Sequence, residues 1–438
     1  MKKKLKLAAA AALMITFAAC GNIGKADPAA ITRKAGAERK PAVSELDDSS
    51  FAAEDTSSSQ AEKTEEQLEK EKKEQEEQDK ITNAVEKTMK DMSVEEKVGQ
   101  LFMIRPDALE ANATPANVSN DTVYGTTYVD QLMVDNMNKY HVGGVVIFKK
   151  NISDTDQLKK LIGDLQKSSE IPMFVGINEE GGDFAPLASS EGFEIKTVDN
   201  MIEIGKTEDG AKAKEVGKKI GGYLSDYGFN LDFAPVADVI TDGSGTTIGS
   251  RSFGSDSDVV AKMVSNEVKG FHESGIMTAV MHFPGQGGAS GGQFSAAKTS
   301  KDWVELMESD IIPFAEVLGD TDMILVGHIN TPEVTNDGLP ASMSKEIIGE
   351  KLRKELGYQG VVISDSMSSA AVTGTYNSGE CAVRAINAGT DIVLMPYDLD
   401  EAYNTVLSAV KDGTISEDRL NESVKRILTL KAEYGLIK

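Results

Sequence analysis

Cysteine is almost absent from the sequence, with two residues in 438, and basic residues are outnumbered by acidic ones. The formal net charge of −24 argues against a nucleic-acid partner, because phosphates would be repelled. No GxGxxG loop follows the first predicted strand, and no HExxH motif occurs anywhere in the chain. We therefore expect neither a dinucleotide cofactor nor a bound metal.

Long hydrophobic runs are also missing, except for one within residues 1–20. There a lysine-rich segment precedes the uncharged run Leu7–Ala19, which is too short to span a bilayer comfortably. The run ends in Phe17-Ala18-Ala19-Cys20, which resembles the bacterial lipoprotein box except that Phe17 stands where Leu is usual. We expect residues 1–20 to be a lipoprotein signal peptide and Cys20 to be lipidated, which places the chain at the cell membrane, on its extracytoplasmic face. An ordinary cleaved signal or a short membrane anchor is the alternative.

Residues 21–88 show no hydrophobic periodicity. The stretch 62–80 is almost entirely charged or Gln, and Leu68 is its only large apolar residue, so no helix face can be buried there. We expect residues 21–88 to be a disordered or solvated-helix tether that acts as a spacer rather than as a binding element. If Cys20 carries lipid, Cys381 has no partner, and we expect it to be a buried structural thiol.

From Met92 onward, short apolar runs alternate with amphipathic helical segments. Continuous apolar runs are typical of parallel strands that are buried on both faces. Eight alternations predict an α/β fold, a single (β/α)8 TIM barrel over residues 89–438, with an open doubly wound sheet as the alternative. The eight runs are Leu101–Ile104, Gly143–Phe148, Met173–Ile177, Leu231–Ala234, Thr278–Met281, Met323–Val326, Gly360–Ile363 and Asp391–Met395.

Polar residues follow most of these runs. Asn178 follows the third, Asp238 the fourth, His282 the fifth, His328 the sixth and Asp365 the seventh. The C-terminal ends of barrel strands meet at one mouth, so we expect these side chains to lie together, although any one of them could merely bond loop backbone. An aspartate in such a place suits attack on the anomeric carbon of a sugar, and a second group must then protonate the leaving oxygen.

Several motifs resemble glycoside hydrolase family 3, in the family's order and over residues 92–438. Their single-domain layout resembles the β-N-acetylhexosaminidase branch of that family. The motifs are MSVEEKVGQLF (92–102), NLDFAPVADV (230–239), RSFGSD (251–256), HFPGQG (282–287), LRKELGYQGVVISDS (352–366), AINAGTDIVLMP (385–396) and ISEDRLNESVKRILTLKAEYGL (415–436).

The resemblance implies a glycoside hydrolase that acts on β-linked N-acetylhexosaminides of cell-wall-type glycans by a retaining mechanism. Asp365 matches the family's catalytic nucleophile. Arg251 and His282 match residues that bind the sugar beside the scissile bond, and Asn178 stands where the family has a sugar-binding Asp. The implied partners are a carbohydrate and, through the lipid, a membrane.

The sequence departs from the branch at its proton donor. The branch's Asp–His dyad corresponds to Gly292 and Phe294, and no other His and no carboxylate lies between His282 and Ser300. Loss of a general acid typically costs about 10²–10⁴-fold in rate. Replacement acids are Glu179, Glu180, Asp183 or a residue of the loop 240–250, and the choice among them stays open.

Other sugar ligands are altered too. The Arg expected after the Glu-Gly-Gly motif is missing, with Asp183 and Pro186 in its place, and the Lys before the HFPG motif is Met281. The alternative function is therefore a catalytically impaired family member that binds glycan or a partner protein without turnover. A metal site built from His282, His328 and Asp365 is a disfavoured third reading, because no compact ligand motif supports it.

Overall fold

A closed barrel of eight parallel strands forms the body of the protein. The structure is a computed structural model that describes residues 65–241, 248–291 and 295–438. The strand order is β10-β1-β2-β3-β4-β5-β7-β9, and a parallel bridge between Ile363 and Ile392 joins β9 to β10 and closes the circle. The predicted TIM barrel is thus confirmed. The strands are β1 (Phe102–Ile104), β2 (Gly144–Val146), β3 (Phe174–Ile177), β4 (Leu231–Asp232), β5 (Met277–Phe283), β7 (Met323–Val326), β9 (Val361–Ser364) and β10 (Val393–Leu394).

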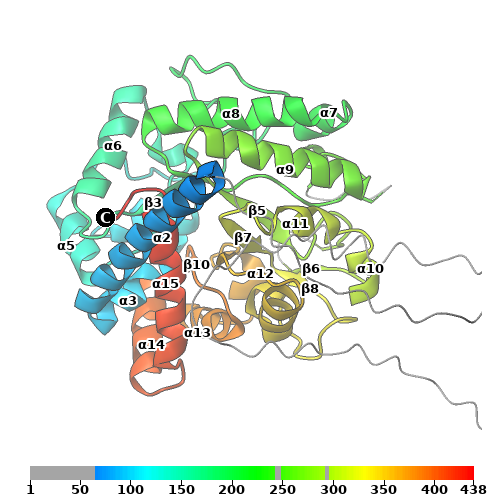
Figure 1. Ribbon diagram of the computed structural model, residues 1–438. Helices are drawn as coiled ribbons and strands as arrows, with labels where there is room; N and C mark the ends of the chain where they lie inside the picture. Colours follow the sequence, from blue (N-terminus) through cyan, green and yellow to red (C-terminus); the bar gives the residue numbers. More distant parts are fainter. Residues whose placement is uncertain (1–64, 242–247, 292–294) are drawn as a thin grey trace, which may run out of the picture.

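Each of the eight predicted apolar runs overlaps one of these strands. Their side chains are buried because the barrel fills its interior and helices cover its outside (Figure 1). The helices that connect successive strands are α5 (Gln131–Tyr140), α6 (Thr155–Lys167), α8 (Gly210–Tyr227), α9 (Ser257–Glu273), α11 (Ile312–Val317), η5 (Glu346–Glu355) and α13 (Ser378–Ala388), and α14 (Leu399–Lys411) and α15 (Glu417–Glu433) follow β10.

The apolar residues that recur at helical spacing in the sequence form the buried faces of their helices. In α6, Asp154 caps the N-terminus by accepting a hydrogen bond from the backbone N–H of Gln157. Its four periodic residues Leu158, Leu161, Ile162 and Leu165 are all buried. In α15, Ser416 is the N-cap and Leu420, Val424, Ile427 and Leu428 are buried in the same way.

A buried carboxylate holds the seam where the barrel closes. Asp391, two residues before β10, is fully buried and accepts a hydrogen bond from the backbone N–H of Val362 in β9 at 3.0 Å. Arg353 and Arg419 donate to the same carboxylate at 2.5 and 3.0 Å. Burial alone would raise the pKa of Asp391, but the guanidinium groups of Arg353, Arg419 and Arg426 lower it overall. The last β/α unit is therefore tied to the sheet by charge as well as by backbone pairing.

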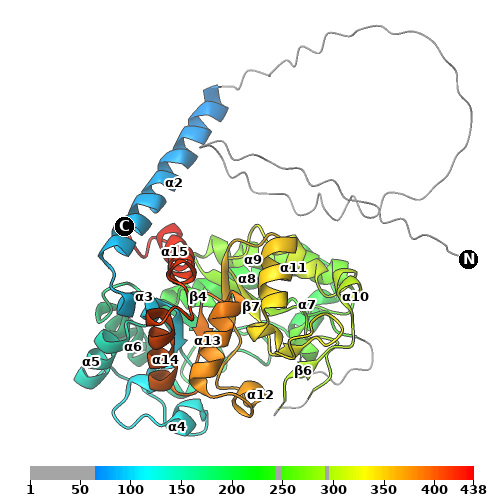
Figure 2. The ribbon, with the colours of Figure 1, turned by 90° about the horizontal axis from the view of Figure 1, so that it is seen from below.

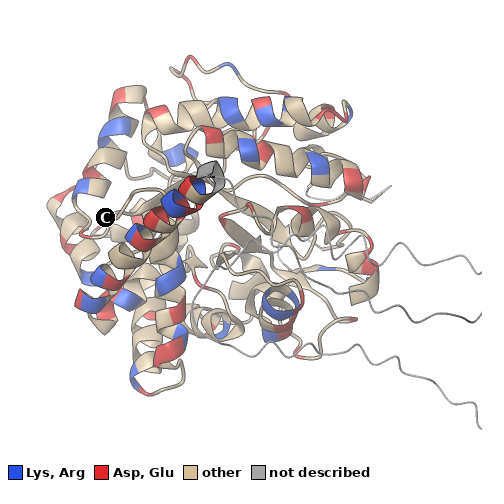
Figure 3. Ribbon diagram, viewed as in Figure 1, with Lys and Arg blue, Asp and Glu red and all other residues tan. Residues whose placement is uncertain are grey.

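The long helix α2 (Glu65–Asp91) projects from the barrel (Figure 2). Acidic and basic residues alternate along it (Figure 3), and residues 68–80 are exposed. Its last part differs, because Ala84 and Val85 are buried and α2 packs against α15. The packed body thus begins near Ile81, inside the segment 21–88 that we expected to be a tether and ahead of residue 89.

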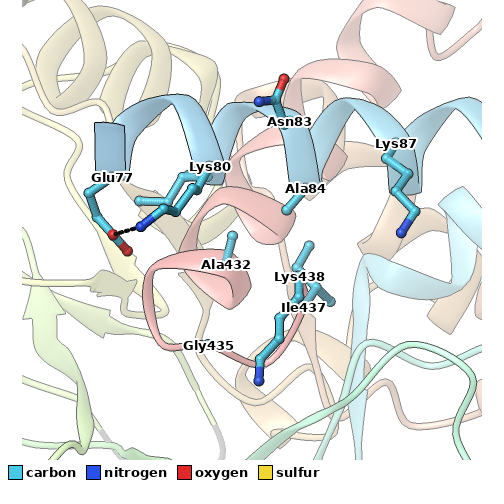
Figure 4. A pocket seen from close by; sticks show the side chains of 10 residues that line it. Glu77, Lys80, Asn83, Ala84, Lys87, Ala432, Gly435, Ile437 and Lys438 are labelled. Atoms are coloured by element: carbon cyan, nitrogen blue, oxygen red, sulfur yellow. Dashed lines mark hydrogen bonds and ion pairs between the residues drawn. The ribbon is translucent and has the colours of Figure 1, made fainter. Parts of the chain in front are cut away.

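A groove of about 510 Å³ lies between α2 and the end of the chain (Figure 4). Ile81, Ala84 and Ile437 give it an apolar floor, and Lys80 and Lys87 lie along its side. Among the described helices, none is long and apolar enough to cross a membrane. Cys381 is buried and free, as predicted for a structural thiol.

Short elements complete the fold. They are α3 (Val94–Gln100), η1 (Pro106–Leu109), α4 (Pro115–Ser119), η2 (Lys149–Asn151), α7 (Met201–Gly205), η3 (Gly249–Arg251), α10 (Trp303–Met307), η4 (Ala341–Met343) and α12 (Ala370–Thr373). A second sheet of two parallel strands, β6 (Ala297–Lys298) and β8 (Ile329–Asn330), was not expected from the sequence. Its strands come from the loops after β5 and β7, so it lies on the side of the barrel where the strands end.

Candidate active site

The predicted sugar-site residues lie at the C-terminal side of the barrel, whereas the predicted lipidation site Cys20 lies outside the described residues. Asn178 follows β3 directly, His282 is the penultimate residue of β5, and Asp365 follows β9 directly. Arg251 reaches the same side from η3, in the loop after β4. In Figure 2, α4, α12 and β6, which follow strand ends, lie on the side of the barrel away from α2. The mouth and the long N-terminal helix therefore occupy opposite faces.

Asp365 is partly exposed at this mouth. Its backbone N–H donates to the carbonyl of Val326 in β7 at 2.9 Å, and its Oδ1 accepts from the N–H of Ser366 at 2.7 Å. Burial raises the pKa of Asp365, but His328, His282, the Ser366 N–H and Arg251 together lower it overall. It forms no ion pair with any residue of the described ranges. The geometry thus leaves an ionised, unpaired carboxylate among groups of positive potential.

His282 is held by a carboxylate that the sequence analysis had placed at the mouth without giving it a role. Its Nδ1 lies 2.6 Å from Oδ2 of the fully buried Asp238, which follows β4. Asp238 also accepts from the backbone N–H of Gln286 at 2.6 Å. Because a carboxylate accepts, Nδ1 of His282 carries the proton, and Nε2 is the nitrogen left for a substrate.

Arg251 forms a two-pronged ion pair with Glu180. Its Nε donates to Oε2 at 2.7 Å and one terminal nitrogen donates to Oε1 at 2.6 Å, while the amide of Asn178 donates to the same Oε1 at 2.6 Å. Burial lowers the pKa of Arg251, but the bonds and charge of Glu180 raise it overall. Glu180 therefore fixes two predicted sugar ligands, Arg251 and Asn178, in one network.

The candidate replacement acids have other roles where the structure describes them. Glu179 is fully buried and accepts from the backbone N–H groups of Leu187 and Ala188 at 2.8 and 2.9 Å, and from the Tyr223 hydroxyl at 2.9 Å. Burial raises the pKa of Glu179 despite these bonds. Asp183 is exposed and accepts from the Asn200 amide at 3.0 Å. With Glu180 bound to Arg251, all three carboxylates are engaged by protein groups.

Gly292 and Phe294, the positions matching the family's dyad, lie outside the described residues, as does most of the loop 240–250. Asp242 is the only carboxyl residue of that loop, so it is the one candidate acid that the described geometry does not test.

The described residues do not assemble a metal centre around Asp365. Both ring nitrogens of His328 have hydrogen-bond partners, the hydroxyl of Ser342 at 2.7 Å and the carbonyl of Ser366 at 2.8 Å. The one group of possible ligands in the described ranges is Glu96, His141 and Glu170. Those residues belong to α3, the end of α5 and the loop before β3, on the side of the barrel away from the mouth.

Asp238 and Glu180 are the site residues that sequence reasoning missed or misassigned. The available signal was their place in the loops after β4 and β3, which the sequence analysis had noted for Asp238 without giving it a role. Their partners, His282 and Arg251, come from other strands, so only the folded chain pairs them.

Comparison with known proteins assigns this barrel to a family. The model of the glycosyl hydrolase family 3 N-terminal domain matches residues 93–430. Beta-hexosaminidase A of Pseudoalteromonas piscicida is 30% identical over 327 residues, 68% of this chain and 54% of that protein. Beta-hexosaminidase LpqI of Mycobacterium tuberculosis is 30% identical over 308 residues, 67% of this chain and 77% of that protein.

Solved structures agree with the sequence relatives. A family 3 beta-N-acetylglucosaminidase from Paenibacillus superposes with a TM-score of 0.70 at 30% identity, covering 79% of this chain and 63% of the other. The chain spans only 54% and 60% of the length of two of its curated relatives, from Pseudoalteromonas piscicida and Cellulomonas fimi. The match over nearly the whole described barrel nevertheless places the protein plainly: the chain belongs to glycosyl hydrolase family 3.

Proposed function

We propose that the protein is a β-N-acetylhexosaminidase that cleaves β-linked N-acetylhexosaminides of cell-wall-type glycans with retention of configuration. The observation that carries the proposal is the environment of Asp365, a partly exposed carboxylate at the barrel mouth whose pKa is lowered by His328, His282, the Ser366 N–H and Arg251, against the effect of its own burial. Relatives named beta-hexosaminidase and beta-N-acetylglucosaminidase support the same substrate class.

The chemistry proceeds in two displacements. First, a carboxylate oxygen of Asp365 attacks the anomeric carbon, the bond to the leaving oxygen breaks, and that oxygen takes the electron pair and a proton. Water then attacks the same carbon and gives its proton to a base, and the ester bond to Asp365 breaks with its electrons returning to the carboxylate. A lowered pKa serves this role, because the nucleophile must be ionised before each cycle.

The sugar next to Asp365 is bound by the two networks described above. His282 offers Nε2 to a sugar hydroxyl, since Asp238 occupies Nδ1. Arg251 donates hydrogen bonds to Glu180 from Nε and one terminal nitrogen. Its other terminal nitrogen makes no hydrogen bond to any described residue. Asn178 is positioned by the same Glu180. These groups orient the substrate and add positive potential where the carboxylate attacks.

The proton donor is the weakest part of the machinery. Glu179, Glu180 and Asp183 are bound by protein groups, which leaves Asp242 as the carboxyl candidate from the loop 240–250. An aryl glycoside with a good leaving group tolerates a poor acid, whereas an alkyl or sugar leaving group does not. We therefore expect faster turnover of aryl glycosides than of disaccharides, by more than their intrinsic reactivity explains.

The test compares wild type, Asp365→Ala and Asp320→Ala on 4-nitrophenyl β-N-acetylglucosaminide. Asp320 is an exposed carboxylate in the turn after α11, at the far side from the mouth, and serves as the matched control. We expect Asp365→Ala to lose several orders of magnitude in kcat and Asp320→Ala to keep wild-type rates. Added azide should restore nitrophenol release by Asp365→Ala, with an α-glycosyl azide as product. Equal rates for Asp365→Ala and wild type contradict the proposal.

A second candidate function is glycan binding without turnover, and one observation favours it. Every candidate acid in the described ranges is already engaged, and the dyad positions hold Gly292 and Phe294. The double substitution Gly292→Asp, Phe294→His separates the two functions. An active enzyme with a poor acid should gain rate mainly on substrates with poor leaving groups. A protein that binds N-acetylglucosamine by calorimetry but hydrolyses nothing, with or without the dyad, is a binding protein.

The same proposal includes a location. We propose that Cys20 is lipidated, that cleavage before it makes it the first residue of the mature chain, and that the barrel is held at the extracytoplasmic face of the cell membrane. The support is the lysine-rich segment, the apolar run Leu7–Ala19 and the small residues before Cys20. Cys20→Ser should abolish labelling by a radioactive or clickable fatty acid and leave the protein out of the lipid-anchored fraction. Unchanged labelling of this variant contradicts the anchor.

A further inference from the structure

We propose that Phe184 is a stacking platform for the pyranose ring on the leaving-group side of the scissile bond. This inference rests on the proposed function, because it extends the site around Asp365 by one sugar. Phe184 is one of the few large hydrophobic side chains that are exposed in the described part of the chain, at 42%, and it is the one that contacts a site residue. It stands in the loop after β3, four residues past Glu180.

A rigid turn fixes the backbone that carries this ring. The N–H of Gly181 donates to the carbonyl of Phe184 at 3.1 Å, and the N–H of Phe184 donates back at 3.0 Å. Gly182 has a φ of 53°, and a Cβ there would lie 2.0 Å from Oδ1 of Asn200. The same Oδ1 accepts from the N–H of Asp183 at 2.9 Å. An exposed ring on such a locked turn loses little freedom when a ligand covers it.

The ring is placed against the sugar network. The guanidinium of Arg251 lies over the Phe184 ring, 4.8 Å from its centroid. Arg251 in turn contributes to the lowered pKa of Asp365, so it lies within electrostatic reach of the nucleophile. Glu180, Arg251 and Phe184 thus form a continuous path of contacts from the buried network to the rim of the mouth.

Exposure along this path indicates which sugar the ring contacts. The side chain of Glu180 is 2% exposed and that of Arg251 is 13% exposed, whereas Phe184 is 42% exposed. A terminal sugar held at Arg251 therefore lies deeper than Phe184, and the next sugar of the chain lies at its level. The C–H face of a pyranose is apolar and neutral, and an aromatic ring already polarised by a cation offers it a matching surface.

The ring of Phe184 also replaces a substrate contact that this loop lacks. The resemblance places an arginine after the Glu-Gly-Gly motif, whereas this chain has Asp183 and Pro186 at the relevant positions. A polar hold on the substrate from this turn is replaced by an apolar one at Phe184. Selectivity should shift accordingly, toward substrates in which a second sugar ring follows the scissile bond and away from those with a small leaving group.

The experiment compares Phe184→Ala and Phe184→Trp with Leu132→Ala, which removes a side chain of similar exposure, 39%, from the outer helix α5. The substrates are N,N′-diacetylchitobiose and methyl β-N-acetylglucosaminide. We expect the ratio of their kcat/KM values to fall about tenfold in Phe184→Ala, through KM of the disaccharide, since burial of one ring face is worth about one order of magnitude. Phe184→Trp should retain the ratio, and Leu132→Ala should equal wild type.

Calorimetric titration of the same variants keeps the inference testable without turnover. N,N′-diacetylchitobiose should bind wild type and Phe184→Trp about tenfold more tightly than Phe184→Ala, while N-acetylglucosamine shows a smaller difference. Selective weakening without any hydrolysis would reject the proposed function and keep the stacking site. Equal losses for both ligands would show that the ring only shields the Arg251–Glu180 pair. Either that result or unchanged affinity of Phe184→Ala for the disaccharide overturns the inference.

Discussion

The ammonium nitrogen of Lys431 lies 2.7 Å from Oε1 of Gln100, and the lysine side chain is completely buried. Lys431 belongs to α15 and Gln100 to α3, so the bond joins the last helix to the helix that leads into β1. The Lys431 nitrogen also lies 5.0 Å from the centre of the Phe174 ring in β3. The buried amine of Lys431 therefore links α15 to α3 and to β3.

Lys431 makes stability depend on pH in a predictable direction. Burial lowers the pKa of Lys431 to about 7, whereas an unfolded lysine titrates near 10.4. Between these values the unfolded chain binds more protons, so the free energy of unfolding rises as pH rises from about 7 to about 10. Lys431→Met lacks this group and should show a smaller rise.

Chemical denaturation of wild type and Lys431→Met at several pH values provides the measurement for Lys431. The difference between the two curves is the readout, because other titrating groups contribute equally to both. Loss of the donor to Gln100 costs Lys431→Met about 1 kcal/mol at every pH and does not change the slope. Parallel curves across pH 7–10 would mean that Lys431 is not charged more easily in the unfolded state.

The Asp238–His282 bond predicts a loss of catalytic efficiency without a loss of fold. Asp238→Asn keeps the shape but removes the negative acceptor of the Nδ1 proton of His282. A hydrogen bond to a charged group contributes about 1.5–3 kcal/mol, so kcat/KM should fall by about 10–100-fold. The downfield proton resonance of the His282 ring should disappear in Asp238→Asn. Wild-type kcat/KM together with a lost resonance would show that His282 needs no fixed tautomer.

The position of the acid limb of activity follows from the charges around Asp365. The pKa of Asp365 is lowered, because His328, His282, the Ser366 N–H and Arg251 outweigh its burial. Asp365, the proposed nucleophile, therefore stays ionised below the ordinary value of about 3.9, and its favourable contribution to stability is present above that value and lost as pH falls through the lowered pKa.

Replacing His328, which contributes most to lowering this pKa, tests the electrostatic explanation. His328→Gln can keep hydrogen bonds to Ser342 and Ser366 but removes the imidazole that lowers the pKa of Asp365. The acid limb of kcat/KM should move to higher pH, while the basic limb stays in place. A pH–rate profile with an aryl substrate measures both limbs. An acid limb that does not move would assign the lowered pKa to the remaining groups.

Helix α2 divides into a part that stabilises the barrel and a part that does not. Val85 is 2% exposed, and Val85→Ala should lower the free energy of unfolding by about 1–3 kcal/mol. The neighbouring substitution Glu86→Ala removes an exposed side chain and should change it by less than about 0.5 kcal/mol. Deletion of residues 1–76 should leave Tm unchanged. A large loss of Tm in that deletion would show that the charged part of α2 also contributes.

The sequence was sufficient to predict the barrel because its signal is strong and local. Each strand interior is a continuous apolar run, and helices such as α6 and α15 carry both an N-cap residue and a complete buried stripe. The small β6–β8 sheet was invisible, since each strand has two residues and the pairing is between distant loops. The start of the packed body was placed too late, because only a few apolar residues around Val85 mark it.

The position of the site could be predicted from the sequence, but the hydrogen bonds and ion pairs among its residues could not. Strand-end reasoning located Asp365 and His282 at one mouth, since topology alone brings strand ends together. It could not show that the carboxylate of Glu179 accepts hydrogen bonds from backbone N–H groups of its own loop. Nor could it show that Glu180 pairs with Arg251, because that bond joins residues 71 positions apart. Which carboxylate is free for chemistry is decided by such pairings.

Helix α2 projects from the barrel on the side away from α4, α12 and β6, which lie at the mouth, and this has a consequence for access. A surface that holds the protein through α2 therefore lies on the side of the barrel away from the mouth. The mouth then faces away from that surface, and the proposed glycan substrate can reach Asp365 without passing the surface. Immobilising the protein on a surface through its N-terminus should for the same reason leave the mouth unobstructed.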